Sequence, residues 1–256
     1  MMPILSVEGL TKRFGARAAC SNVGFSLWPG EVLGIVGESG SGKTTLLNCL
    51  AGRLTPEEGR VVYDSAAYGP VEVHALSEAR RRLLARTEWG FVNQDAREGL
   101  RMGVSAGANI GERLMAVGAR RYADIRGRAS HWLDRVEIDA SRIDDRPTTW
   151  SGGMRQRLQI ARNLVSDPRL VFMDEPTGGL DVSVQARILD LLRGLVEGLH
   201  LSAVLVTHDL GVARLLTHRL MVMQGGQVVE QGLTDQVLDD PQHPYTQMLV
   251  ASILPV

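Results

Sequence analysis

The fold of this chain is decided by the stretch Gly37-Glu38-Ser39-Gly40-Ser41-Gly42-Lys43-Thr44, which matches the P-loop pattern G-x-x-x-x-G-K-[ST]. The apolar run Val32–Val36 precedes it and is typical of a buried strand, and Thr45–Leu50 is compatible with a helix. A strand, a glycine loop and a helix in that order are the context that this pattern requires. The alternative is a glycine-rich turn that matches by chance, and the flanking segments argue against it.

Each part of this loop has a chemical reason to be there. Glycines allow backbone N–H groups to converge on phosphate oxygens without a Cβ in the way, and the helix N-terminus adds partial positive charge. Lys43 is expected to reach the β- and γ-phosphates, and the Thr44 hydroxyl is expected to bind Mg²⁺. Lys12 and Lys43 are the only lysines in the chain, so a lysine at this position is not casual surface charge. The sequence therefore predicts a phosphate-binding site.

Length and composition are those of a globular protein with one large domain, or with a core and a subdomain. The 256 residues are 44% hydrophobic and carry a net charge of -1, which implies no general affinity for nucleic acid or anionic membranes. Cys20 and Cys49 have neither C-x-x-C nor metal-ligand spacing, which indicates reduced thiols. Residues 1–11 lack a signal-peptide pattern, and no run approaches the roughly 18 apolar residues of a membrane span. We therefore expect a cytoplasmic location, with any membrane role supplied by a partner.

Hydrophobic periodicity predicts a β-rich chain that is interrupted once. Besides the strand before the P-loop, strands are expected at residues 4–7, 23–27, 60–63, 89–92 and 203–206, with a hairpin around Gly225-Gly226. Between residues 96 and 144 the β signal fades, and alanine, arginine and leucine recur at helical spacing until Pro147. The predicted fold class is α/β, in one domain. Residues 1–95 and 150–256 form a P-loop NTPase core with a mixed sheet and an N-terminal antiparallel β part, and residues 96–149 form an inserted helical subdomain.

Three further places carry side chains that are typical of a site. An apolar strand ends in Asp174 and Glu175, which beside a P-loop are expected to bind Mg²⁺ and to act on water, a surface turn being the alternative. Ser151 fits a helix N-cap, and the two glycines after it leave a bare helix N-terminus that suits an anion, although such helices are common. His208 follows a buried strand, where the ligand crevices of α/β proteins lie, although a lone histidine is usually structural.

Five stretches, taken in order, resemble the motifs of an ABC-type ATPase and together cover nearly the whole chain. They are Gly37–Thr44, Gln94, Ser151–Gln156, Asp174–Glu175 and Thr207-His208. The resemblance implies ATP and Mg²⁺ as cofactors and hydrolysis of ATP to ADP and phosphate. It also implies sites that form between two head-to-tail subunits, most simply a homodimer.

The resemblance assigns nucleotide contacts that the residues alone leave open. Phe14 lies in the predicted loop between the first strands, where the residues alone favour the core, whereas the resemblance implies stacking on adenine. The P-loop together with Thr45 would hold the phosphates. Ser151, Gly152 and Gly153 resemble the signature motif, which caps the γ-phosphate of ATP held by the other subunit.

The remaining roles concern hydrolysis. Gln94 resembles the Q-loop glutamine, which meets Mg²⁺ or the attacking water and lies beside a partner-docking surface. Glu175 would orient and deprotonate water, and His208 resembles the switch histidine that contacts the γ-phosphate. Asp181 resembles the acid of the D-loop.

The chain departs from the family pattern at three places. Trp150 stands where leucine is commonest, and Met154 stands where glutamine is commonest. Gly178-Gly179 replaces the more usual Ser-Ala before Leu180-Asp181. The first two changes leave the serine and glycines intact, so we expect ATP capping to survive, whereas the third is expected to loosen communication between the two sites.

Two resemblances narrow the subfamily. The signature region and the tail His243–Thr246 resemble the ATPases of dipeptide and oligopeptide importers. Four other segments resemble the ATP-binding subunits of bacterial carbon–phosphorus lyase systems: residues 27–34, 86–90, 109–115 and 176–185. The second resemblance implies that the partner is a soluble phosphonate-degrading complex rather than a permease.

Three rival functions remain at this point. An import motor that docks on permease helices shares the same ATPase and differs only in its partner. A binding module that holds ATP without hydrolysing it conflicts with the presence of Glu175 and His208. A monomeric kinase or GTPase would leave Ser151–Gly153 without a role.

Overall fold

The structure, a computed structural model, describes residues 2–252, which divide into two compact units. The first unit contains residues 2–81 and 195–252, and the second contains residues 82–194. Over the described residues, no helix combines the length and the apolar character needed to cross a membrane. The predicted boundaries of the helical subdomain, residues 96–149, stay a prediction.

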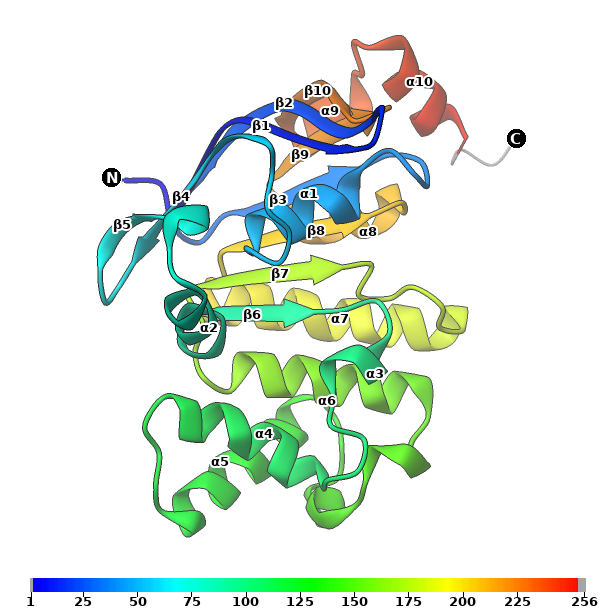
Figure 1. The fold of residues 1–256 in the computed structure, drawn as a ribbon. Helices are drawn as coiled ribbons and strands as arrows, with labels where there is room; N and C mark the ends of the chain where they lie inside the picture. Colours follow the sequence, from blue (N-terminus) through cyan, green and yellow to red (C-terminus); the bar gives the residue numbers. More distant parts are fainter. Residues whose placement is uncertain (1, 253–256) are drawn as a thin grey trace. The chain divides into compact units, whose positions relative to one another are not determined.

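The first unit contains an antiparallel sheet with the strand order β2-β1-β4-β5 (Figure 1). Its strands are β1 (Leu5–Phe14), β2 (Arg17–Leu27), β4 (Glu58–Ser65) and β5 (Gly69–Glu72). β1 and β2 pair with Leu5 opposite Leu27 and Phe14 opposite Arg17. The prediction of antiparallel strands before the P-loop is confirmed, but both strands are longer than expected, so Phe14 ends β1 instead of lying in the loop.

A mixed sheet in the same unit runs in the order β10-β9-β3-β8. Its strands are β3 (Val32–Val36), β8 (Ala203–Thr207), β9 (Arg219–Gln224) and β10 (Gln227–Leu233). Every residue of β3 and β8 is buried, as strands covered on both faces require, and the two strands are parallel with Val36 opposite Thr207. The predicted hairpin joins β9 to β10, and Gly225 and Gly226 both have positive φ angles, 56° and 85°.

Four helices complete the description of the first unit: α1 (Lys43–Leu50), α8 (Leu210–Leu216), α9 (Thr234–Asp239) and α10 (Pro244–Ala251), with the short 3-10 helix η1 (Val73–Ala75). One core cluster joins β3 and β9 to α8, α9 and α10. It consists of Val36, Leu210, Ala213, Leu220, Val222, Val237, Leu238 and Tyr245. The C-terminal helix is therefore packed into the same core as the strand that leads to the P-loop.

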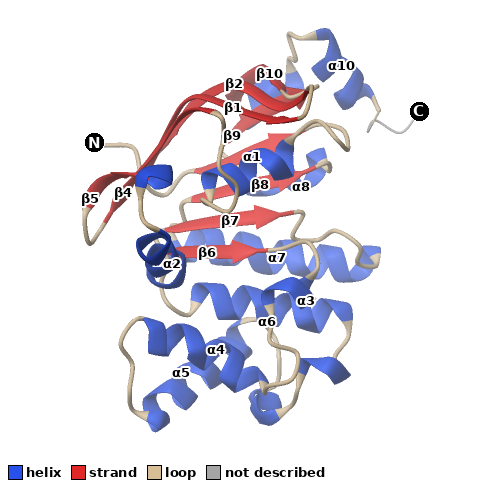
Figure 2. Ribbon diagram, viewed as in Figure 1, coloured by secondary structure: helices blue, strands red, loops and turns tan. Residues whose placement is uncertain are grey.

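The second unit is mainly helical, as Figure 2 shows for the segment between α3 and α6. Its two strands, β6 (Trp89–Val92) and β7 (Leu170–Asp174), are parallel, with Val92 opposite Met173. Its helices are α3 (Ala96–Gly99), α4 (Ala106–Ala116), α5 (Tyr122–Arg135), η2 (Ala140–Asp144), η3 (Pro147–Thr149) and α6 (Gly152–Leu164). The division between the units falls within α2 (Glu78–Thr87) and α7 (Val182–Leu199).

Candidate functional site

The P-loop connects the end of β3 to the start of α1 in the first unit, and its glycines are required by close backbone contacts. A Cβ on Gly37 would lie 2.2 Å from the Met223 carbonyl oxygen, and a Cβ on Gly42 would lie 1.8 Å from the Ala19 carbonyl oxygen. Both glycines also have left-handed φ angles, 148° and 104°. The loop is thus held against the backbones of β2 and β9 in a conformation that only glycine permits.

The ammonium group of Lys43 lies inside this loop. Its Nζ donates to the carbonyl oxygens of Gly37 at 2.7 Å and Glu38 at 2.8 Å, and the residue is only 6% exposed. Within the described residues, no side chain caps the N-terminus of α1. Backbone N–H groups at a helix start, together with a buried ammonium, favour an anion. The loop therefore fits the triphosphate that its sequence predicts.

His208 lies at the same edge of the mixed sheet as the P-loop. Because β3 and β8 are parallel and Val36 is opposite Thr207, the residues that follow these two strands emerge side by side. Asp209 then caps α8, accepting hydrogen bonds from Gly211 N at 2.8 Å and Val212 N at 3.2 Å. The structure thus brings the exposed His208 to the P-loop side of the first unit.

Phe14 is exposed, which corrects the interpretation as a core residue that the residues alone favoured. Its exposed fraction is 56%, and the Lys12 Nζ lies 5.5 Å from the ring centroid. Lys12 in turn pairs with Glu57 at 2.6 Å. A ring that ends a strand with most of its face open is suited to stacking on a planar ligand.

The second unit brings Gln94 close to the two candidate carboxylates. β6 and β7 are parallel, so Gln94, two residues beyond β6, emerges at the edge where β7 ends in Asp174. Glu175 adopts a left-handed backbone with φ 45°, and its carbonyl oxygen accepts the Gly178 N–H at 2.8 Å. A non-glycine residue held in this region costs about 1–3 kcal/mol, and such strain concentrates at functional sites.

The signature residues start α6 as predicted. The Ser151 Oγ accepts the Met154 N–H at 3.3 Å, which confirms the N-cap. A Cβ on Gly153 would lie 2.4 Å from Val184 Cγ1, and a Cβ on Gly152 would lie 3.1 Å from Leu180 Cδ2. The glycines therefore also allow α6 to begin in close contact with the chain around the start of α7.

Two of the departures from the family pattern share one partner, Arg142. The guanidinium of Arg142 lies 5.1 Å from the ring centroid of Trp150, and its Nη1 contacts the Met154 sulfur at 3.4 Å. Trp150 is buried, and Asp145 holds the Arg142 Nε at 2.8 Å. An aromatic ring and a thioether around one cation therefore replace the commoner leucine and glutamine.

The third departure is explained by backbone conformation and space. Gly179 has a left-handed φ of 72°, and a Cβ on Gly178 would lie 3.1 Å from Gln94 Nε2. Both glycines line a cleft of about 320 Å³ that brings the Q-loop, the start of α6 and the D-loop together. Its lining is Gln94, Asp95, Ala96, Arg97, Gly152, Arg155, Gln156, Gly178, Gly179 and Leu180.

Mg²⁺ was predicted on Thr44, Gln94 and Asp174. Among the described residues, no group of three or more histidine, cysteine, aspartate or glutamate side chains could hold a metal by itself. Mg²⁺ at nucleotide sites is usually bound by one or two protein oxygens together with phosphate oxygens and water. A hydroxyl, an amide and a carboxylate are oxygen ligands of the kind that Mg²⁺ prefers, but Thr44 belongs to the first unit and Gln94 and Asp174 to the second, so a shared ion stays a prediction.

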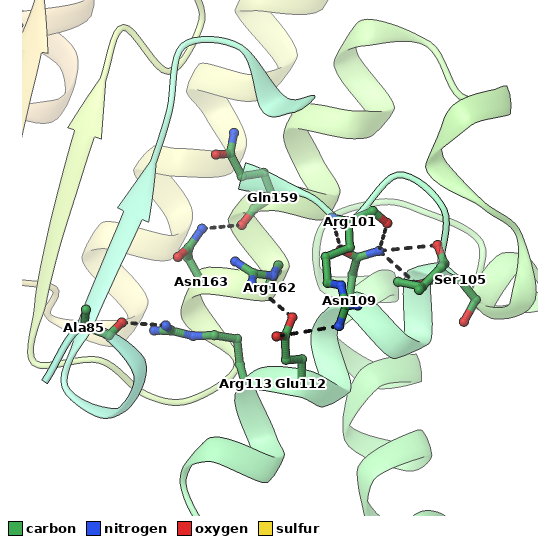
Figure 3. Close-up of polar contacts among 10 residues, drawn as sticks. Ala85, Arg101, Ser105, Asn109, Glu112, Arg113, Gln159, Arg162 and Asn163 are labelled. Atoms are coloured by element: carbon green, nitrogen blue, oxygen red, sulfur yellow. Dashed lines mark hydrogen bonds and ion pairs between the residues drawn. The ribbon is translucent and has the colours of Figure 1, made fainter. Parts of the chain in front are cut away.

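Sequence reasoning missed a set of buried amides on α6 and the charged residues beside it. Figure 3 shows Asn163 Nδ2 donating to the Gln159 carbonyl oxygen and Arg113 donating to the Ala85 carbonyl oxygen. Burial lowers the pKa of Arg113 to about 10, and nearby Arg162 adds to the effect. The amides Gln156, Gln159 and Asn163 recur at helical spacing, as polar residues do on the exposed face of a surface helix. The sequence therefore offered no signal that these side chains are buried.

Comparison with known proteins identifies the class. A family model described as ABC transporter matches residues 20–178. A dimeric structure of MJ0796, a bacterial ABC transporter cassette, is 30% identical with a TM-score of 0.80, covering 90% of this chain and 98% of that one. The chain belongs to the ABC transporter ATPases, and it is an ATPase that binds ATP. The predicted fold class is thereby confirmed.

Among the relatives, the phosphonates utilization ATP-binding protein PhnK of Escherichia coli (strain K12) is 67% identical over 252 residues, covering 98% of both chains. A peptide import ATP-binding protein of Brucella abortus (strain 2308) is 40% identical over 98% of this chain and 77% of its own length. MJ0796 was also solved as a dimer in a post-hydrolysis state bound to ADP and Pi. The chain is thus similar to proteins of both subfamilies that its sequence resembles.

Proposed function

We propose that this ATPase drives or regulates a cytoplasmic phosphonate-degrading carbon–phosphorus lyase complex through ATP-dependent pairing of two subunits. The observation that carries the proposal is the 67% identity, over almost the whole chain, with a protein named for phosphonates utilization. The identity with peptide import proteins is lower, at 40%. The dimeric MJ0796 structures support the pairing.

In this proposal each site uses the P-loop of one subunit and Ser151–Gly153 of the other. Phe14 stacks on adenine, while the loop from Gly37 to Thr45 holds the phosphates. Lys43 exchanges its present carbonyl partners for phosphate oxygens and offsets the charge that develops there. The N-terminus of the opposing α6 adds its partial positive charge.

Glu175 orients the attacking water and takes its proton, a contribution typically worth about 10²–10⁴-fold. His208 contacts the γ-phosphate, and Asp181 contributes to the nucleotide site as the acid of the D-loop. Thr44, Gln94 and Asp174 would hold Mg²⁺, and the ion would supply positive charge that offsets the negative charge of the nucleotide phosphates. The strained backbone at Glu175 supports a role for this residue in the reaction.

The hydrolytic role is tested with Glu175→Gln. This variant should nearly abolish turnover while keeping ATP bound and stabilising the dimer. Glu137→Gln is the matched control, since Glu137 also has a left-handed φ of 56° but pairs with Arg157 at 2.9 Å on the surface. Normal steady-state turnover of Glu175→Gln would reject the assignment.

The P-loop role is tested separately with Lys43→Ala. Because the ammonium would lie against the phosphates, ATP binding should weaken, as measured by titration calorimetry. An unchanged ATP affinity would count against the loop as the phosphate site.

The partner is tested by tagging the full chain in a host that grows on a phosphonate and identifying what co-purifies. Recovery of soluble phosphonate-degrading subunits would support the proposal. The alternative is the nucleotide-binding subunit of a peptide, nickel or phosphonate importer, for which the 40% identity with peptide import proteins is the supporting observation. Recovery of integral membrane permease subunits would establish that alternative and overturn ours.

A further inference from the structure

One buried side chain of α6 holds the backbones of two loops at once. Gln156, which is 2% exposed, donates from Nε2 to the carbonyl oxygen of Pro176 at 2.8 Å and to that of Asn93 at 3.3 Å. Its Oε1 accepts Gln159 Nε2 at 3.1 Å. Both ends of this amide are therefore used, so the side chain has little freedom to turn.

The two carbonyl groups belong to neighbours of the proposed reacting residues. Asn93 directly precedes Gln94, and Pro176 directly follows Glu175. A Cβ on Gly178 would lie 3.1 Å from Gln94 Nε2 and 3.2 Å from Glu175 Cβ, so these two side chains approach the same point. Movement of the Gln156 amide would change the distance between them.

The neighbouring amides of α6 hold β6 and the residue that follows it, but not the loop after β7. Gln159 Oε1 accepts the Asn93 N–H at 2.8 Å, and Asn163 Oδ1 accepts the Phe91 N–H at 3.0 Å. Gln159 Nε2 also donates to the Asn93 carbonyl oxygen at 3.1 Å, so two amides share that carbonyl group. Both residues are as deeply buried as Gln156. Of the three amides, Gln156 is the one that reaches Pro176, which separates its role from that of a general support for β6.

We propose that Gln156 is a positioning residue for ATP hydrolysis, which sets Glu175 against Gln94 by holding the carbonyl groups of Pro176 and Asn93. The inference rests on the proposed roles of Glu175 and Gln94. Since α6 begins with the signature residues, the helix that caps ATP of the other subunit also sets the water-activating residue of its own chain. An event at one site is thereby coupled to the other through the contact of Gln156 with Pro176.

The first test compares Gln156→Met with Asn163→Leu in the full-length chain. Both changes replace a buried amide of α6 by an apolar side chain of similar size. Gln156→Met should lower kcat by about 10- to 100-fold, the loss expected for a misplaced reacting group, with ATP affinity changed less than about threefold. Asn163→Leu should keep kcat within about twofold. Equal kcat losses in the two variants would overturn the proposal.

The decisive test combines Gln156→Met with Glu175→Gln. If Gln156 acts through Glu175, the double variant should retain the residual turnover of Glu175→Gln alone, because the two losses are not additive for groups that act together. If the double variant instead loses turnover by the product of the two single losses, Gln156 affects turnover independently of Glu175, and the proposal is overturned. Normal turnover of Glu175→Gln alone would instead reject the proposed function, so the two failures are distinguishable.

A second variant covers the case in which Gln156→Met does not fold. Gln156→Glu keeps the shape and an acceptor for Gln159 Nε2, but as a carboxylate it has no donor for Pro176. It should show the same loss of kcat. Wild-type turnover in this variant would overturn the proposal.

Discussion

The paired glycines at 178 and 179 allow backbone strain to be separated from the placement of a reacting residue. Gly179 has a left-handed φ of 72° and open space where a Cβ would stand, whereas Gly178 is not left-handed but lies against Gln94 and Glu175. Gly179→Ala therefore changes conformational energy without a clash. Gly178→Ala changes contacts without forcing a left-handed alanine.

The magnitudes follow from these two geometries. An alanine in the left-handed region costs about 1 kcal/mol, which corresponds to a Tm about 2–4 °C lower for a chain of this size. At position 178 the new Cβ would lie 3.1 Å from Gln94 Nε2, closer than ordinary contact, so the amide must move by a few tenths of an ångström. The exposed amide can move, but the Glu175 carbonyl oxygen and Cβ, each 3.2 Å from the new Cβ, must give way as well. Gly178→Ala should therefore also cost some stability, and displacement of the two side chains should lower turnover by about tenfold.

The assay measures Tm by thermal unfolding and turnover by phosphate release for both variants. Gly179→Ala should lower Tm and keep turnover within about twofold, whereas Gly178→Ala should lower turnover by about tenfold. If turnover of Gly178→Ala stays normal, the close approach of Gly178 to Gln94 and Glu175 does not place these side chains for hydrolysis, and the reasoning is wrong.

Three further outcomes are expected. Tyr245→Phe removes the hydroxyl that accepts the Glu38 N–H at 3.0 Å, and denaturant unfolding should show a loss of about 1 kcal/mol. A stability equal to wild type would show that water replaces this contact. Burial lowers the pKa of His74, so the unfolded chain binds this proton more tightly and stability should fall as the pH drops below about 6.5. His74→Gln should show a shallower fall in Tm between pH 7 and pH 5, and an identical slope would contradict this. Arg142→Met removes the cation from the Trp150 ring, which should lower stability by about 0.5–1 kcal/mol, with Arg146→Met as the exposed control. A smaller loss than in the control would argue against the contact.

Local patterns were sufficient for the parts of the site that are contiguous in the chain. The P-loop and the helix N-cap at Ser151 depend on residues a few positions apart, and the structure confirms both the loop context and the cap. The hairpin at Gly225-Gly226 is also confirmed. It was predictable because two adjacent glycines are typical of a tight turn between antiparallel strands. The roles of the individual site residues in catalysis stay predictions.

Contacts between distant residues could not be predicted from local patterns. Tyr245 and Glu38 are 207 positions apart, and nothing in either segment indicates that they meet. Gln156 looks like part of a polar helix face, yet it is buried because backbone carbonyl groups lie opposite it. Phe14 shows the converse error: an aromatic residue between strands suggests the core, but it ends its strand and faces outward.

The scarcity of lysine gives this protein an unusually simple response to amine-directed chemistry. Its two lysine side chains differ in surroundings. The Lys12 amine, near the end of β1, pairs with Glu57, whereas the Lys43 amine is enclosed by the P-loop. An acylating reagent followed by mass spectrometry would therefore yield two side-chain signals, one of them an internal reference. Because bound phosphates would shield the Lys43 amine, the ratio of the two signals would report how much of the protein holds nucleotide.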